Sequence, residues 1–169
     1  MKRLFYCVLT VAILGGIFFW FTRKTEEKVD VLALSQQTEQ IALQIRDNTI
    51  EYVTAHRNLS KQHFNPFLKE GMFPNMEMVC NRQDNTCTNQ HFIYTGKCNL
   101  ENCLLNVAYA QKKTPKLNKT DVDYMINMQV RPNQNVRLWK RVCFYNTPLG
   151  QQVCDYLKER GWKVKLFDK

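Results

Sequence analysis

The residues best suited to chemistry in this chain are its cysteines. Six of the seven follow residue 79 and form three couples that are close in sequence: Cys80 and Cys87, Cys98 and Cys103, and Cys143 and Cys154. Couples of this kind are typical of disulfide bonds, which persist in oxidising compartments and are rare in the cytosol. Pairing within each couple is our hypothesis, although six cysteines allow many other connectivities.

Metal binding is the alternative use of these cysteines, and their spacing does not favour it. No couple has the Cys-x2-Cys spacing of a zinc knuckle, and His56, His63 and His91 do not stand beside the cysteines. The absence of Cys-x-x-Cys also argues against thiol–disulfide catalysis. We therefore predict no metal ligand and no cofactor.

Catalytic motifs are missing from the sequence. It contains no Gly-x-Ser-x-Gly, no His-Glu-x-x-His and no glycine-rich loop that could cradle a phosphate. Asp121 and Asp123 share a face where a strand is expected to begin, but carboxylates before a strand are more often solvated turn residues. We predict that the protein is not an enzyme, has no catalytic residue and takes no small-molecule substrate.

The chain is basic, with 24 Lys or Arg against 15 Asp or Glu and a formal net charge of +9. Basic residues interleaved with aromatics such as Trp139 and Tyr145 can hold nucleic acid through phosphates and stacking. A solvated basic surface is the alternative interpretation, and we favour it at this point. The residues of this candidate basic patch are Lys112, Lys113, Lys116, Lys119, Arg137, Lys140 and Arg141.

An uncharged apolar run covers residues 4–21, between Lys2 and Arg3 on one side and Arg23 and Lys24 on the other. A helix of about 20 apolar residues, or slightly fewer, can span a bilayer. A cleaved signal peptide is the rival interpretation, but the run ends in Phe18–Phe21, whereas a cleavage site needs small residues. We predict a single-pass span at 4–21 in the inner membrane and a cytoplasmic stub at 1–3. The cysteines then place the rest in the periplasm or outside the cell.

Residues 28–60 contain neither Gly nor Pro and have a helical hydrophobic pattern. We predict an amphipathic spine helix at 22–60 that continues the membrane span, giving one helix from about residue 4 to 57. A coiled coil is an alternative role for its stripe, which can also cover the protein's own sheet. The helix-packing candidates are Val31, Leu34, Ile41, Ile45 and Tyr52.

The remaining residues, 61–169, are expected to form a disulfide-stapled globular head. Alternating patterns predict strands at 91–98, 104–110, 124–130 and 136–145, with turn residues between them. Strands in close succession without intervening helices indicate an antiparallel meander. The predicted fold class is α+β: a long N-terminal helix, comprising the membrane span and the amphipathic spine, packed on an antiparallel sheet of about four strands.

This architecture resembles a type IV pilin or pseudopilin. Residues 12–60 are similar to the family's helical spine, and the segment VCFY…LGQQVCDYL at 142–157 resembles the ending of a bacterial subgroup with a C-terminal cysteine pair. The resemblance implies a pilin-like fold, with Cys143 and Cys154 as the C-terminal disulfide and Cys80 and Cys87 as a second pair. The family's prepilin peptidase motif, a Gly followed by Phe-Thr-Leu-Ile-Glu, has no counterpart here.

The resemblance implies a membrane-anchored structural or interaction protein, a minor or divergent component of a type IV pilus or a type II secretion-like assembly. Its partners would be the membrane and other pilin-like subunits or assembly components. The alternative is a membrane-tethered extracytoplasmic binding module that uses the basic patch, with nucleic acid as a less favoured partner.

Overall fold

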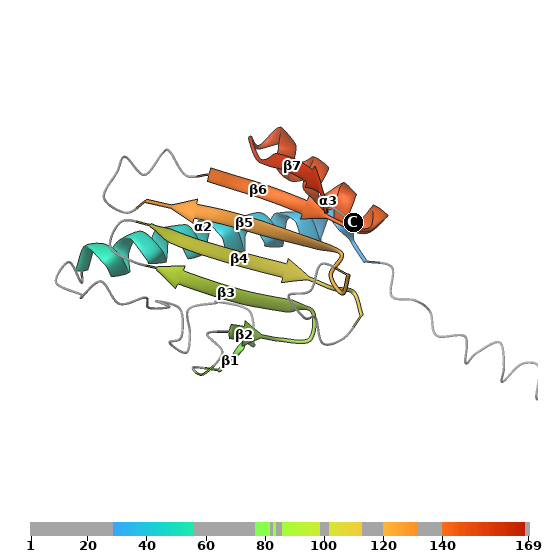
Figure 1. Cartoon of the computed structure of the whole chain (residues 1–169). Coiled ribbons are helices and arrows are strands. Elements are labelled where there is room, and N and C mark those ends of the chain that lie inside the picture. Colours follow the sequence, from blue (N-terminus) through green and yellow to red (C-terminus); the bar gives the residue numbers. More distant parts are fainter. Residues whose placement is uncertain are drawn as a thin grey trace, which may run out of the picture. The chain divides into compact units, whose positions relative to one another are not determined.

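The computed structural model describes residues 29–55, 77–81, 83, 86–98, 102–112, 120–131 and 140–167, with only the backbone described at 52–55 and 98 (Figure 1). The chain divides into two compact units, Met1–Asp30 and Val31–Lys169. All described helices and strands belong to the second unit.

The second unit is built on a seven-stranded sheet whose strands lie in sequence order from β1 to β7 (Figure 1). Each neighbouring pair from β1 to β6 is antiparallel, whereas β7 runs parallel to β6. The parallel pair requires a crossover, which helix α3 supplies. The strands are β1 Val79–Asn81, β2 Thr86–Thr88, β3 Phe92–Cys98, β4 Cys103–Tyr109, β5 Tyr124–Val130, β6 Lys140–Tyr145 and β7 Lys163–Leu166.

Helix α2, Val31–Ala55, lies behind the sheet in Figure 1 and buries one of its sides. That side combines the apolar Leu34, Ile41 and Ile45 with Ser35, Thr38 and Thr49, and all six are buried. Each of these three hydroxyls donates to the backbone carbonyl four residues earlier, at 2.6–2.8 Å. Because the hydroxyls are satisfied within the helix, short polar side chains can face the sheet without a desolvation penalty.

One buried hydrogen bond joins α2 to the sheet. The Tyr124 hydroxyl lies 2.6 Å from Thr38 Oγ1, and both side chains are fully buried. Since the Thr38 hydroxyl already donates to Leu34 O at 2.8 Å, Tyr124 is the donor in this bond. Burial raises the pKa of Tyr124 well above its ordinary value. The bond therefore fixes the position of α2 along β5.

Helix α3, Pro148–Glu159, begins with a side-chain cap and a close backbone contact. Thr147 Oγ1 accepts a hydrogen bond from Gly150 N at 3.2 Å and donates to Asp123 Oδ1 at 2.8 Å. The other Asp123 oxygen accepts from Gln111 N at 2.6 Å, so this carboxylate links the end of β4 to the start of α3. A Cβ at Gly150 would collide with the Asp123 carbonyl oxygen. Only glycine therefore allows α3 to approach β5 this closely.

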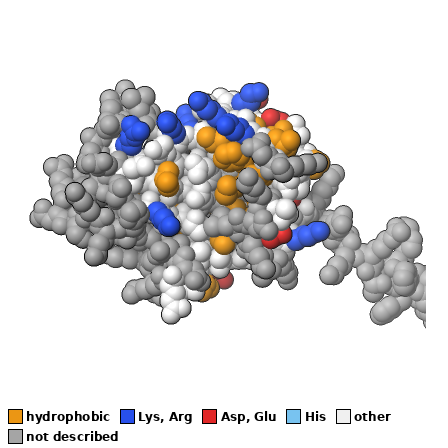
Figure 2. All heavy atoms as spheres, in the orientation of Figure 1, with side chains coloured by type: hydrophobic (Ala, Val, Ile, Leu, Met, Phe, Trp, Pro, Cys, Tyr) orange, Lys and Arg blue, Asp and Glu red, His pale blue; other side chains and the backbone are white. Residues whose placement is uncertain are grey.

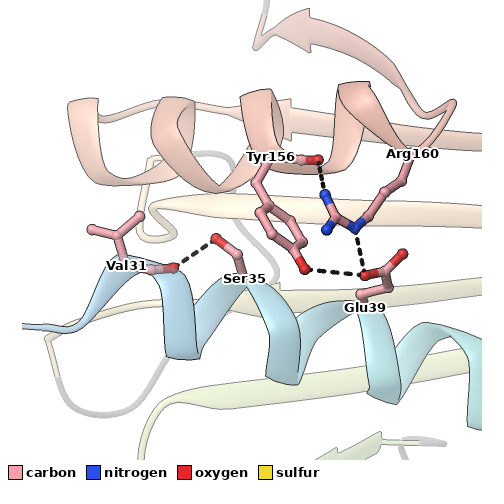
Figure 3. A network of polar contacts seen from close by, with 5 residues as sticks. All are labelled: Val31, Ser35, Glu39, Tyr156 and Arg160. Atoms are coloured by element: carbon pink, nitrogen blue, oxygen red, sulfur yellow. Dashed lines mark hydrogen bonds and ion pairs between the residues drawn. The ribbon is translucent and has the colours of Figure 1, made fainter.

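A second polar group links α3 to α2 (Figure 3). Arg160 Nε lies 2.9 Å from Glu39 Oε2, and the Tyr156 hydroxyl donates to the same oxygen at 3.3 Å. The Arg160 guanidinium also stacks on the Tyr156 ring at 3.6 Å from its centroid. The helix ends at Glu159, and Gly161, which follows the capping residue Arg160, has a φ of 83° that favours glycine.

Disulfide bonds lie near both edges of the sheet. Cys80 is bonded to Cys87 across the β1–β2 pair, and Cys143 of β6 is bonded to Cys154 of α3. Cys103 is also disulfide-bonded, and the strand register places the backbone of Cys98 directly opposite it. The expected disulfide bonding is thus present in the described head. On the chain-entropy model, the Cys143–Cys154 bridge is worth about 3 kcal/mol.

The predicted fold class is wrong. The sheet has seven strands rather than about four, it includes a parallel pair, and a second helix packs beside α2. The helix begins at Val31, because Val29 and Asp30 are not helical, so the single helix expected from residue 4 to 57 is interrupted. Aspartate is favoured just before a helix, and a search for Gly and Pro breakers alone overlooks that signal.

The predicted strands at 91–98, 104–110 and 124–130 correspond to β3, β4 and β5, each within one residue at either end. The fourth predicted strand, at 136–145, corresponds to β6 from Lys140 onward, and residues 136–139 lie outside the described part. β1, β2 and β7 were not predicted, because they are only three or four residues long and bury little apolar surface.

No helix among the described residues is long and apolar enough to cross a membrane. The predicted span at 4–21 and the stub at 1–3 lie outside those residues.

Tyr124 gives the fold a characteristic dependence on pH. Burial raises the pKa of both Tyr94 and Tyr124 above the ordinary value of 10.0. The unfolded chain therefore releases these protons first, and the free energy of unfolding should fall as the pH rises above about 10. Tyr124→Phe should cost about 1 kcal/mol at pH 7 and reduce that fall, measured by urea unfolding at pH 7 and 10.5. If the free energy of unfolding of Tyr124→Phe falls as much between these pH values as that of wild type, Tyr124 is not responsible for the pH dependence.

The contact at Gly150 gives a second prediction. Gly150→Ala should lower the free energy of unfolding by about 2 kcal/mol or more, because the added methyl group meets backbone that cannot move aside. Urea unfolding measures the loss, and Gln151→Ala, at an exposed position one residue further along the helix, is the control. Equal stability of the two variants would show that α3 does not approach β5 as described.

Candidate functional site

The two faces of the sheet have different surroundings. Side chains alternate along each strand, so Tyr124, Ile126 and Met128 of β5 point towards α2, and Met125, Asn127 and Gln129 point away. No described helix covers the second face, which is turned towards the viewer in Figures 1 and 2. We call it the open face, and on β3–β7 its side chains include Thr95, Lys97, Leu104, Asn106, Met125, Asn127, Gln129, Lys140, Val142, Phe144, Lys163 and Lys165.

An apolar row borders the open face at one end of the strands. Ile93, Ala108, Met125 and Phe144 stand in register across four adjacent strands. Val122 and Phe167 pack onto this row, and the rings of Phe144 and Phe167 stack with centroids 5.4 Å apart. This small second core anchors the chain after β7, because Phe167 N also donates to Tyr145 O at 3.0 Å.

The next row across the open face is polar. Thr95, Asn106 and Asn127 are in register on β3, β4 and β5, and all three are half-buried. Asn127 Nδ2 donates to Asn106 Oδ1 at 2.6 Å, and Asn106 Nδ2 donates to Thr95 Oγ1 at 3.4 Å. The amides are thus held in a fixed line, and each has donor or acceptor capacity beyond these two bonds.

Charge on the strands has one sign. They contain Lys97, Lys140, Arg141, Lys163 and Lys165, and neither Asp nor Glu occurs in any of the seven. The four lysines lie on the open face and are exposed, and within the described residues none is paired with a carboxylate. Figure 2 shows Lys and Arg side chains gathered along the β6–β7 side of this face. A sheet face with this charge, which no described helix covers, suits an anionic partner.

Helix α2 offers a second uncovered surface. Leu32 and Leu43 are 57% and 36% exposed and stand three helical turns apart, on the side opposite the buried stripe. The exposed residues between them, Ala33, Gln36, Gln37 and Gln40, are uncharged. We call this surface the outer side of α2. An exposed surface with two leucines and uncharged glutamines, beside the ion-paired Glu39, is suited to packing against another helix or protein.

The structure separates the residues of the predicted basic patch. Lys140 lies on the open face, whereas the next residue, Arg141, points to the other face and lies 6.0 Å from the ring of Trp162. Lys112 is exposed in the turn after β4. The other four predicted members, Lys113, Lys116, Lys119 and Arg137, lie outside the described residues.

The predicted helix-packing residues lie mostly inside the domain. Leu34, Ile41 and Ile45 are buried against the protein's own sheet and α3, and Val31 is half-buried. Tyr52 belongs to α2, at a position where only the backbone is described. The stripe therefore covers the protein's own core, which was one of its two expected uses.

Of the two aspartates considered for catalysis, Asp121 and Asp123, the second links other segments of the fold. Asp123 is occupied by Thr147 and by the backbone of Gln111, and Asp121 is exposed in the preceding turn. Among the described residues, no group of His, Cys, Asp or Glu could hold a metal ion.

The sequence analysis missed Lys97, Lys163, Lys165 and the amides of the open face. A signal for part of this surface was present, because Lys-Val-Lys-Leu at 163–166 alternates as a strand does. Lys97 fell within the predicted strand 91–98, but it was not assigned to the basic patch.

Comparison of the chain with known proteins gives no match. The chain matches no protein-family model, and neither a curated protein nor a solved structure matches it.

The amide row gives a prediction that separates binding from stability. Replacing both Asn106 and Asn127 by Val removes a donor together with its acceptor and adds residues that favour strands, so the free energy of unfolding should stay within about 1 kcal/mol or rise. Urea unfolding measures it. A loss above about 2 kcal/mol would mean that the row holds the sheet together and is not kept for a ligand.

Proposed function

We propose that this protein is a membrane-anchored structural or interaction protein, a minor or divergent pilin-like component of a type IV pilus or type II secretion-like assembly. In this proposal the apolar run at 4–21 is a single inner-membrane span, and the domain from Val31 onward lies in the periplasm or outside the cell. The protein performs no catalysis and recruits its partners by surface contacts.

The disulfide bonds are the observation that carries the proposal. Cys80–Cys87 and Cys143–Cys154 tie a short hairpin and a helix to the sheet, and Cys103 is bonded as well. Such bonds persist where the environment is oxidising. Together with the uncharged run that precedes the domain in sequence, they favour an anchored extracytoplasmic head over a cytosolic protein.

The outer side of α2 supports the choice of an assembly role. The buried stripe is used by the protein's own sheet, so a neighbouring subunit has to use the other side of the helix. Leu32 and Leu43 supply apolar contact there, the glutamines beside them are uncharged, and the nearby Glu39 is already ion-paired with Arg160.

The topology is tested by the mass of the full-length protein extracted from membranes and alkylated without reduction. One free thiol, at Cys7, is expected, because the other six cysteines would be paired outside the cytoplasm. Recovery in the cytosolic fraction with seven free thiols would refute the proposed location.

The assembly role predicts the effect of charge on the outer side of α2. Leu32→Asp/Leu43→Asp should leave the domain folded and its disulfides intact, because both side chains are exposed, but should abolish co-purification with pilin-like or secretion components. Affinity purification from membranes, read by mass spectrometry, measures this. Val79→Asp, at an exposed apolar residue of β1, is the control. The role is refuted if wild type captures no such component, or if the double variant captures as much.

A further inference from the structure

The described contacts within the fold give no structural role to the positive charge of the open face. Lys97, Lys140, Lys163 and Lys165 are exposed, and no described carboxylate compensates them. The described acidic side chains lie instead just before and on α2, just before β1, in the turn before β5 and on α3. Like charges on one surface repel each other, so this face is best stabilised by an anionic partner.

Three of the lysines form a line along β6 and β7. Lys140 precedes Val142 by two residues on β6, Val142 is in register with Lys163 on β7, and Lys165 follows two residues later. Side chains two apart on one face of a strand are about 6.6 Å apart, and neighbouring strands are about 4.8 Å apart. Cations repeated at such distances match a polymer with regularly spaced anionic groups better than they match a single anion.

A ring and a row of amides lie beside this line. Phe144 is in register with Lys165, is half-buried on the open face and is held in place by stacking on Phe167. Asn127 is in register with Val142, and Gln129 with Lys140. A cation, an aromatic ring and amide side chains can contact, respectively, a phosphate, the face of a base and the polar edge of a base.

We propose that the open face binds single-stranded nucleic acid. The phosphates follow the line of Lys140, Lys163 and Lys165, and the unpaired bases turn inward onto Phe144 and the amides. A flat sheet face reaches the bases of a single strand, whereas in a duplex the bases are stacked inside. An anionic polysaccharide would also bind the lysines, but it has no bases to stack on the Phe144 ring. This binding is independent of the proposed assembly role, which uses the outer side of α2.

The test uses the full-length chain, purified in mild detergent with its disulfides intact. Fluorescence anisotropy measures binding to a thymidine oligonucleotide of about twenty nucleotides over a range of salt concentrations. A duplex of the same length and a heparin fragment of similar charge are the competing probes. The variant is Lys163→Gln/Lys165→Gln. Its matched control is Lys112→Gln/Lys158→Gln, which removes the same charge from exposed positions outside the open face.

Wild type should bind the oligonucleotide at least tenfold more tightly than the duplex or heparin. The Lys163→Gln/Lys165→Gln variant should lose about tenfold in affinity, and the slope of log affinity against log salt should become shallower by about 1 to 1.5. The control should stay within about twofold of wild type.

Three results would overturn the proposal. Equal losses in the variant and the control would mean that only net charge matters. Heparin or duplex binding as tight as the oligonucleotide would assign the face to another polyanion or to duplex. Aggregation of the variant with unchanged oligonucleotide affinity would mean that the two lysines only protect an exposed sheet edge.

Discussion

The contact between α2 and β5 is the constraint on which the rest of this structure depends. The apolar side chains on one face of the sheet, such as Leu105, Ile126 and Met128, must be removed from water, and α2 is the longest described element that covers them. Tyr124, the first residue of β5, donates to Thr38 in that contact, while small side chains such as Ala42 let the helix approach closely. Because the helical hydroxyls are satisfied by their own backbone, this face excludes water without leaving polar groups unpaired.

The other elements follow from that placement. Once α2 covers β5, α3 can dock beside it, guided by Gly150 against Asp123 and secured by Cys143–Cys154. The crossover through α3 then forces β7 to run parallel to β6, which sets Lys163 and Lys165 next to Val142 and Phe144. The basic open face is thus a consequence of topology as much as of composition.

Local patterns predicted the elements that alternate clearly, and they failed where tertiary contacts decide. The strict alternation of Tyr124–Val130 located β5 without error, because half-buried strands have a period of two. The three-residue strands β1 and β2 exist only as partners of their neighbours. The basic patch was treated as a linear cluster, whereas alternation sends Lys140 and Arg141 to opposite faces of the sheet. Lys163 and Lys165 join Lys140 only through a parallel pairing that no local pattern reveals.

The central claim is that the sheet has one covered face and one open face, and adjacent leucines of β4 test it most directly. Leu104 is 45% exposed on the open face, and Leu105 is fully buried on the covered face. Each is replaced singly by Cys in the oxidised full-length protein, and the rate of reaction with a thiol reagent is measured without denaturant. The account predicts that the Leu104→Cys thiol reacts at least a hundredfold faster than the Leu105→Cys thiol, because labelling at 105 requires opening of the domain. Equal rates at the two positions in folded protein would contradict it.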